Sequence, residues 1–404
     1  MCIYRLSIVF LLVLLVLSSI PIVAETSILV RVIVGVEMSA FTRARDVLKG
    51  YGAIYSEIPE IGTIALEIPQ RALKYIERLS GIRYVELDAE LFALGEVQWN
   101  IEMINATDVW SKYSSYGDAA YGYDTTVEVA VIDTGIDYSH RDLQGAVTWC
   151  VVSLRNTKTF YEGSNLKNCG DNNGHGTHVA GIIAARVNGF GVAGVAPKAR
   201  LYAVKVLSAS GIGYISDVAK GIVEAAKGPD NTPGTDDDAD VISMSLGGPD
   251  SQTLYSAIQY AYSYNITLVA AAGNEGASQP TCPACYSEVI AVGAIDHNYD
   301  VATWSNRNVD LVAPGVDILS TWPKNKYAYA SGTSMACPHV SGVVVLIQTL
   351  RLANGRPKLT PAQIYTTLTT TAVDLGENGP DQLYGYGLVD AYRAVENALQ
   401  IEGS

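Results

Sequence analysis

The sequence predicts an α/β protein in which a domain of three layers, with a mostly parallel sheet at its centre, follows a small α+β domain. Two observations carry this prediction. From residue 95 onward, short continuous apolar runs alternate with segments of helical spacing, which is typical of a parallel sheet covered by helices on both faces. Before residue 95, the order of segments is β-α-β-β-α-β, the split βαβ arrangement.

The elements of both domains follow from local patterns. In the small domain, β-branched or alternating runs and helical spacing predict strands at 28–36, 53–56, 63–68 and 83–87 and helices at 41–50 and 70–80. In the larger domain they predict strands at 127–132, 200–206, 241–244, 267–271 and 289–294 and helices at 179–185, 215–226, 253–264 and 334 to about 350. Folds of this kind bind ligands beyond the carboxyl ends of the parallel strands, so polar residues that follow these strands are site candidates.

Composition excludes some classes of partner. The 404 residues carry a formal net charge of −14, and 17% of them are charged, which is a globular rather than a disordered balance. An acidic surface repels the phosphates of nucleic acids and of anionic lipids. We therefore expect no nucleic acid and no anionic lipid surface as a partner.

The first 24 residues have the features of a signal peptide. Arg5 precedes an apolar run over residues 6–20, and Ala24 offers a small residue for cleavage. The rival interpretation is an uncleaved membrane anchor, but the apolar core is shorter than the about 20 residues that a spanning helix needs. The sequence therefore predicts a secreted protein with no membrane partner after removal of residues 1–24.

The cysteines fit an exported protein. Six are present, and Cys2 leaves with the signal. Two spacings favour disulfides in an oxidising compartment, rather than a redox or zinc site: Cys150 with Cys169, and Cys282 with Cys285. Cys337 is left unpaired within an apolar helix, and we expect it to be a buried thiol.

Three segments place reactive side chains at the ends of predicted elements. Asp133 follows an apolar strand, His175 stands between two glycines at a helix start, and Ser334 opens a long apolar helix. Taken singly, each has an ordinary explanation: a turn residue, a polar helix start or a metal pair with His178, and a helix N-cap. Their combination on one α/β chain is what carries information.

In this order, the segments 127–135, 173–182 and 330–340 resemble the three signature segments of the subtilisin-like serine proteases, the subtilases. The resemblance covers residues 95–404. It implies a subtilisin-like three-layer fold and a secreted serine endopeptidase of the pro-subtilisin type.

The resemblance also implies the role of each chemical group. Ser334 would be the nucleophile, His175 the general base, and Asp133 the residue that orients and stabilises the imidazole. Asn274 follows the strand at 267–271 and matches the family's side-chain donor to the oxyanion.

Substrate would bind as an added strand between residues 208–213 and 243–248, in the manner of the family. The substrate-binding residues that the resemblance implies are Gly211, Gly213, Ser245, Leu246, Gly247, Gly273 and Glu275. Glu275, at the rim of the main specificity pocket, either attracts a basic side chain or is simply solvated.

Residues 25–94 resemble the family's inhibitory propeptide, a ferredoxin-like domain that also assists folding. Self-cleavage between Leu94 and Gly95 would follow, and the propeptide would act as an intramolecular inhibitor until it is cleared. An ordinary accessory domain is the alternative. The mature part, residues 95–404, is expected to act as a monomer on proteins and peptides.

Structural calcium is the expected cofactor, because residues 188–192 resemble the family's strong calcium loop. The ligands that this implies are the side chains of Glu96, Asp142 and Asn188 and the carbonyls of Arg186, Phe190 and Val192. Acids that include Asp236 and Asp238 crowd an insertion, which predicts either a further calcium site or a solvated acidic loop. Asp310 is a candidate for a weaker cation site.

Two alternatives compete with a broad-specificity endopeptidase. A proprotein convertase with basic-site specificity needs several acids in its cleft and usually a further β domain. A catalytically silent binding protein on the same scaffold is disfavoured, because the nucleophile, base, orienting acid and oxyanion donor are all present. A serine esterase would show G-x-S-x-G, whereas residues 332–336 lack the second glycine.

Overall fold

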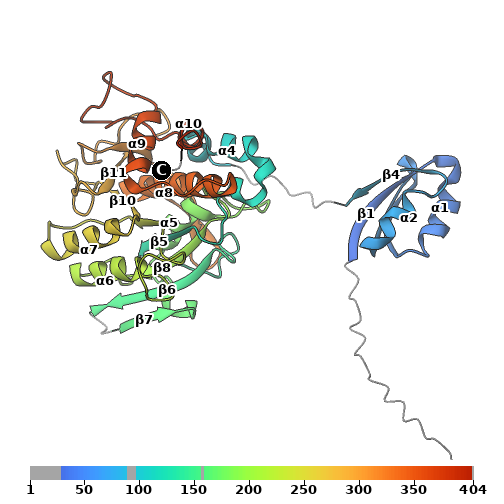
Figure 1. Ribbon diagram of the computed structural model, residues 1–404, viewed down its shortest axis with the longest axis horizontal. Coiled ribbons are helices and arrows are strands. Elements are labelled where there is room, and N and C mark those ends of the chain that lie inside the picture. The colour runs from blue at the N-terminus through green and yellow to red at the C-terminus, as the bar shows by residue number, and fades with distance from the viewer. Residues whose placement is uncertain (1–28, 89–96, 156–158, 403–404) are drawn as a thin grey trace, which may run out of the picture. The chain divides into compact units, whose positions relative to one another are not determined.

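The computed structural model describes residues 29–88, 97–155 and 159–402. The chain divides into two compact units, Met1–Leu91 and Phe92–Ser404, and each is considered by itself (Figure 1). The signal peptide expected at residues 1–24 and the maturation bond expected between Leu94 and Gly95 lie outside the described residues.

The first unit is a four-stranded antiparallel sheet with two short helices. Its sheet order is β2-β3-β1-β4, as the split βαβ pattern requires. Its elements are β1 (Leu29–Val36), α1 (Phe41–Leu48), β2 (Ala53–Ile58), β3 (Thr63–Pro69), α2 (Leu73–Ile76) and β4 (Ile82–Leu87). Helix α2 is shorter than the predicted helix over 70–80, because the chain after Ile76 tightens into three-residue turns before Gly81.

An eight-stranded sheet forms the centre of the second unit, in the order β12-β11-β10-β9-β5-β8-β6-β7. All neighbours are parallel except β6 and β7. Its strands are β5 (Glu128–Asp133), β6 (Val147–Leu154), β7 (Thr159–Gly163), β8 (Arg200–Lys205), β9 (Val241–Met244), β10 (Thr267–Ala271), β11 (Val289–Ile295) and β12 (Leu311–Pro314). The predicted α/β class with a mostly parallel sheet is confirmed.

Two helix pairs cover this sheet. Helices α5 (His175–Ala184) and α8 (Thr333–Ala353) pack together, and so do α6 (Ile215–Ala225) and α7 (Gln252–Ser263) (Figure 1). Helix α5 begins at His175, the helix start that the glycine-flanked motif predicts, whereas the apolar pattern alone covers only 179–185, because the first turn has small and polar residues. Among the described residues, α8 is the one helix long and apolar enough to cross a membrane, but 94% of its most apolar stretch is buried in this core.

The sequence patterns did not predict several short elements. They are α3 (Trp99–Met103), α4 (Ala106–Lys112), β6, β7, β12, β13 (Ile318–Trp322), β14 (Lys326–Ala330), α9 (Pro361–Thr371) and α10 (Ala391–Ala398). Most are too short to show a period. The hairpin of β13 and β14 is placed by packing against α5, a long-range contact that local patterns do not report.

Both predicted disulfides are formed, Cys150–Cys169 and Cys282–Cys285. Cys337 is a buried free thiol within α8, as expected. The first bridge ties β6 to the short helical turn Leu166–Cys169, which precedes the loop that leads into α5.

Removing the Cys150–Cys169 bridge should lower the free energy of unfolding by about 3 kcal/mol, because it closes a loop of 19 residues in the unfolded chain. The double substitution Cys150→Ser and Cys169→Ser, followed by chemical denaturation, measures this loss. Cys282→Ser with Cys285→Ser is the matched control, since a separation of 3 residues should contribute only about half as much. Equal losses for the two pairs would contradict the loop-closure account.

Candidate active site

Asp133 lies at the carboxyl end of β5, the strand between β8 and β9, and its side chain is buried. Its Oδ1 accepts a hydrogen bond of 2.6 Å from the backbone N–H of Thr134. The uninterrupted apolar strand therefore delivers one carboxylate to the edge of the sheet where ligands bind in such folds.

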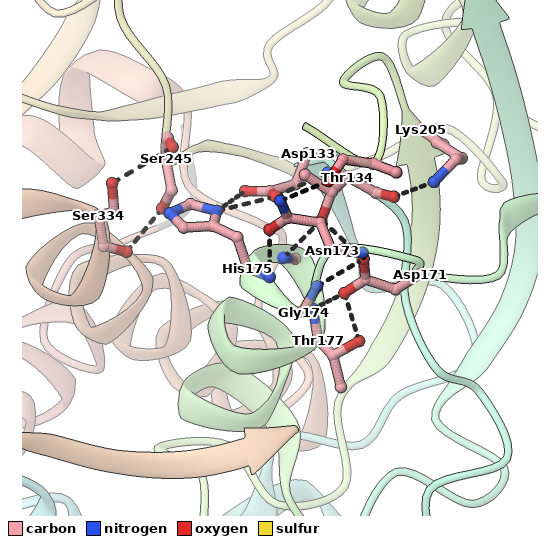
Figure 2. Close-up of polar contacts among 12 residues, drawn as sticks. Asp133, Thr134, Asp171, Asn173, Gly174, His175, Thr177, Lys205, Ser245 and Ser334 are labelled. Atoms are coloured by element: carbon pink, nitrogen blue, oxygen red, sulfur yellow. Dashed lines mark hydrogen bonds and ion pairs between the residues drawn. The ribbon is translucent and has the colours of Figure 1, made fainter. Parts of the chain in front are cut away.

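His175 is the first residue of α5, and its imidazole faces Asp133. Its Nδ1 lies 2.9 Å from both carboxylate oxygens of Asp133 (Figure 2). The glycines on either side are required: Gly174 has φ 116°, and a Cβ on Gly176 would collide with the carbonyl oxygen of Gly135. With Nδ1 carrying the proton toward the carboxylate, Nε2 is the nitrogen left to act as a base.

Charge sets the basicity of this imidazole. Burial lowers the pKa of His175, but the negative charge of Asp133, its hydrogen bond and the charge of Asp171 outweigh burial, so the pKa is raised above its ordinary value. The His175 side chain keeps 31% of its surface exposed, while Asp133 keeps 1%. The imidazole is thus both reachable from the cleft and stabilised as a cation from behind.

Ser334 stands in the first turn of α8. Its Oγ donates to the Ser245 carbonyl at 3.4 Å, and Ser245 Oγ donates to the Ser334 carbonyl at 2.8 Å. Figure 2 shows the imidazole of His175 between Asp133 on one side and Ser334 and Ser245 on the other. Within the described residues, Ser334 and His175 form no hydrogen bond with each other, which is common for catalytic pairs without substrate.

Two hydrogen bonds fix the side-chain oxygen of Asn274. Its Oδ1 accepts from the Thr333 N–H at 2.8 Å and from the Thr333 hydroxyl at 3.0 Å, which leaves Nδ2 as the free donor. Asn274 and Ser334 line the same pocket, of about 230 Å³. Asn274 and Ser334 thus line one small space, which is compatible with an amide donor to an oxyanion beside the serine.

The expected substrate-binding residues line two adjoining depressions. A cleft of about 450 Å³ contains His175 together with Gly211, Gly213, Ser245, Leu246 and Gly247. The smaller pocket, with Ser334, contains Leu246, Gly247, Gly273 and Glu275. Because the residues 246–248 line both, the two form one continuous surface. Glu275 is exposed at the rim and accepts a 3.0 Å hydrogen bond from Asn306.

The expected calcium loop brings Asp142 and Asn188 together. Asp142 is fully buried, and its oxygens meet only neutral donors: the Asn188 amide at 3.2 Å, the Val192 N–H at 3.1 Å and the Tyr327 hydroxyl at 2.8 Å. The backbone N–H of Arg186 donates to the Asp142 carbonyl. A buried carboxylate that no cationic side chain reaches, among the described residues, fits a bound cation.

Two further residues adjoin this loop that the sequence did not single out. Gln98 Oε1 accepts from the N–H of Ala193, which follows the expected carbonyl ligand Val192, and the hydroxyl of Tyr327 contacts Asp142. Glu96 lies outside the described residues, and Phe190 contributes an N–H to the Asn188 amide oxygen at 3.4 Å.

The other expected metal residues do not form a cluster of ligands. Within the described residues, no group of three or more His, Cys, Asp or Glu side chains is placed to hold a metal, in the Asp142 loop or elsewhere. Asp236 and Asp238 line one surface cavity, and Asp238 accepts hydrogen bonds from the loop's own Gly234 and Thr235 N–H groups. Asp310 has both oxygens engaged, by the Ala291 N–H and the Tyr365 hydroxyl, so it secures a strand edge.

His178 does not pair with His175. It is buried, and its Nε2 donates to the carbonyls of Ile318 and Ala328, both at 3.0 Å. Burial, first of all, lowers the pKa of His178 to about 4. The metal-pair interpretation of these two histidines is therefore wrong: one faces the carboxylate and the other faces the β13–β14 hairpin.

A buried Asp–His pair and a serine in the first turn of a helix, lining two adjoining pockets, form the arrangement that is typical of a serine peptidase. The family profile described as "Subtilase family" matches residues 124–387, well over half of the chain, and the chain belongs to that family. It is a subtilisin-like serine endopeptidase.

Named relatives agree with this family. "M-protease" of Shouchella clausii is 39% identical over 342 residues, which are 84% of this chain and 80% of that protein. "Subtilisin DY" of Bacillus licheniformis is 42% identical over 69% of this chain and 94% of its own length. "Intracellular serine protease" of Paenibacillus polymyxa is 42% identical over 73% of this chain and 86% of its own length.

The neutral, buried His178 should make the fold sensitive to acid. Between pH 6.5 and about 4, the imidazole of His178 binds a proton in the unfolded chain but not in the native protein. The free energy of unfolding is therefore highest above pH 6.5 and falls as the pH drops through this range. The contribution of His178 should reach about 3 kcal/mol of unfolding free energy, and buried His339, whose pKa is also lowered to about 4, should add a similar contribution. His178→Gln should therefore make the dependence of unfolding free energy on pH less steep, whereas the same change at exposed His297 should leave it unaltered. An unaltered slope in His178→Gln would contradict the assignment.

Proposed function

We propose that this endopeptidase is secreted and hydrolyses proteins with broad specificity through an acyl-enzyme on Ser334, with Asp133, His175 and Asn274 as the other catalytic residues. The observation that carries the proposal is the pair of 2.9 Å contacts between His175 Nδ1 and the buried carboxylate of Asp133. That contact leaves Nε2 as the other imidazole nitrogen, which faces Ser245 in the cleft and Ser334 in the adjoining pocket.

Acylation follows from these positions. His175 Nε2 removes the proton of the Ser334 hydroxyl as its oxygen bonds to the scissile carbonyl carbon, and the carbonyl oxygen becomes an oxyanion. The Asn274 amide and N–H groups at the start of α8 donate to that oxygen. The C–N bond then breaks, and the imidazolium gives its proton to the leaving amine, with Asp133 stabilising the cation meanwhile.

Deacylation repeats the sequence with water. His175 takes a proton from a water molecule, whose oxygen attacks the ester carbon, and the second intermediate releases the carboxylic acid while Ser334 regains its proton. An extended peptide would add as a strand beside residues 211–213 and 246–248, and pairing through the backbone would tolerate many side chains.

We also propose that residues 25–94 are a propeptide, cut by the same site between Leu94 and Gly95 and retained as an inhibitor. The separate core of the first unit and its ferredoxin-like sheet order support this proposal. Secretion is supported by the apolar leader and by two disulfides, which persist in oxidising compartments. One relative bears the name of an intracellular protease, so family membership alone does not decide location.

Calcium is the proposed structural cofactor of the loop around Asp142. The side chains of Asp142 and Asn188, with Gln98 beside them, and the carbonyls of Arg186, Phe190 and Val192 would hold it. Bound calcium would supply the positive charge that the buried Asp142 carboxylate lacks.

Ser334→Ala should lower the cleavage of casein and of chromogenic peptides by more than about 10⁴-fold, because the nucleophile is removed. The same variant, expressed as the full chain, should keep its N-terminal unit attached. Ser331→Ala is the matched control, since this neighbouring hydroxyl contacts only Asp317 and should leave both processes intact. Normal proteolysis by Ser334→Ala would contradict the assignment of Ser334 as the nucleophile.

Chelation should lower the melting temperature of the Ser334→Ala chain, which cannot digest itself, by several degrees or more. Asp142→Asn should abolish the difference between samples with calcium and with EDTA. Asp238→Asn should preserve it, because that carboxylate binds its own loop. A melting temperature that EDTA leaves unchanged argues against calcium, and loss of the effect in Asp238→Asn would move the site to the acidic loop.

A further inference from the structure

A second buried carboxylate lies behind the Asp133–His175 pair. Asp171, in the loop before α5, is 9% exposed and accepts five hydrogen bonds (Figure 2). They come from the Thr134 hydroxyl, the N–H groups of Asn173 and Gly174 at 2.9 Å each, the N–H of Thr177 at 3.0 Å and the Thr177 hydroxyl at 2.6 Å. Asp171 thus fixes the chain on both sides of His175.

The buried ammonium group of Lys205 contacts the backbone next to both carboxylates, Asp133 and Asp171. Lys205, the last residue of β8, is 5% exposed, and its Nζ donates to the carbonyls of Thr134 and Gly170. Burial lowers the pKa of Lys205, while the charges of Asp171 and Asp133 act to raise it. A lysine is rarely buried without such opposite charges near it, so the ammonium and the two carboxylates depend on one another.

Thr134 connects these groups to the catalytic pair. Its N–H donates to Asp133, its carbonyl accepts from Lys205, and its hydroxyl donates to Asp171 while accepting from the Gly176 N–H at 2.9 Å. Every polar group of this one residue is therefore engaged, and its partners lie on β5, on β8, in the loop before α5 and in the first turn of α5.

We propose that Asp171 and Lys205 are positioning residues that hold Asp133 and His175 in register for catalysis, with Thr134 as the link between them. Neither touches the substrate: within the described residues, neither lines the cleft or the pocket beside Ser334. The inference rests on the proposed role of His175 as general base and adds what keeps that base in place.

The arrangement has an electrostatic consequence with a definite sign. The charged or titratable groups that face His175 are Asp133 from β5, Asp171 from the preceding loop and His178 on α5; Lys205 acts from β8 on the two carboxylates. His178 is neutral above about pH 4. Removing the charge of Asp171 should therefore lower the pKa of His175, and removing that of Lys205 should raise it.

The test compares Asp171→Asn, Lys205→Met and the double variant, made as the full chain, by the pH dependence of kcat/KM on a chromogenic peptide. The acidic limb should move to lower pH in Asp171→Asn and to higher pH in Lys205→Met, by about half a unit or more each, and return toward the wild type in the double variant. At the optimum, kcat should fall about 10- to 100-fold in Asp171→Asn with KM changed less than about threefold. Acidic limbs that do not move in the two single variants, or that move in the same direction in both, would overturn the proposal.

A second pair guards against misfolding of those variants. Thr134→Ser keeps the linking hydroxyl and should retain most of kcat. Thr134→Val loses it and should resemble Asp171→Asn in kcat, while its acidic limb should stay near that of the wild type, because the charge of Asp171 is still present. Equal activity of the two variants would also overturn the proposal. The wild-type and Ser334→Ala chains, assayed alongside, test the proposed function separately. An inactive wild-type chain would contradict the proposed function and not the positioning role of Asp171 and Lys205.

Discussion

The geometry of the candidate active site depends on burying the carboxylate of Asp133 while supplying it with hydrogen-bond donors. A buried charge is tolerated only when hydrogen bonds and opposite charges surround it. The donors here are the Thr134 N–H and the imidazole of His175, and both are themselves held by the network of Asp171 and Lys205. The same bonds that satisfy the carboxylate therefore fix the orientation and tautomer of the base.

Close approach of the backbone makes this possible. Helix α5 must begin directly beside the end of β5, and a side chain at residue 176 would collide with the Gly135 carbonyl oxygen. Glycine at 176 removes that obstacle, and glycine at 174 adopts a φ of 116° beside the ring of Trp322. The N–H and the hydroxyl of Thr177 then bind Asp171, which holds the first turn of the helix.

Environment, not residue type, decides what the two histidines of this helix do. His175 and His178 lie three positions apart on α5, yet the pKa of the first is raised and that of the second is lowered. The first faces a carboxylate, whereas the second faces only carbonyls and a packed hairpin. The first imidazole therefore binds a proton more readily than a free one, and the second stays neutral above about pH 4 and binds the hairpin.

The sequence by itself determined the α/β class, the main strands and helices and both disulfides, because apolar runs, glycine positions and cysteine spacing are local signals. The residues of the site came from the resemblance of their segments to one family. The sequence did not reveal Asp171, Lys205 or Gln98, although Asp171 ahead of Gly174 and Thr177 has the pattern of a helix cap. It offered Asp236 and Asp238 either as calcium ligands or as part of a solvated acidic loop, and Asp310 for a weaker cation site; the structure adds that Asp238 binds its own loop and that both oxygens of Asp310 accept hydrogen bonds. Only the tertiary structure decided which side chains are buried and which partners they bind, because most of those partners come from segments distant in the chain.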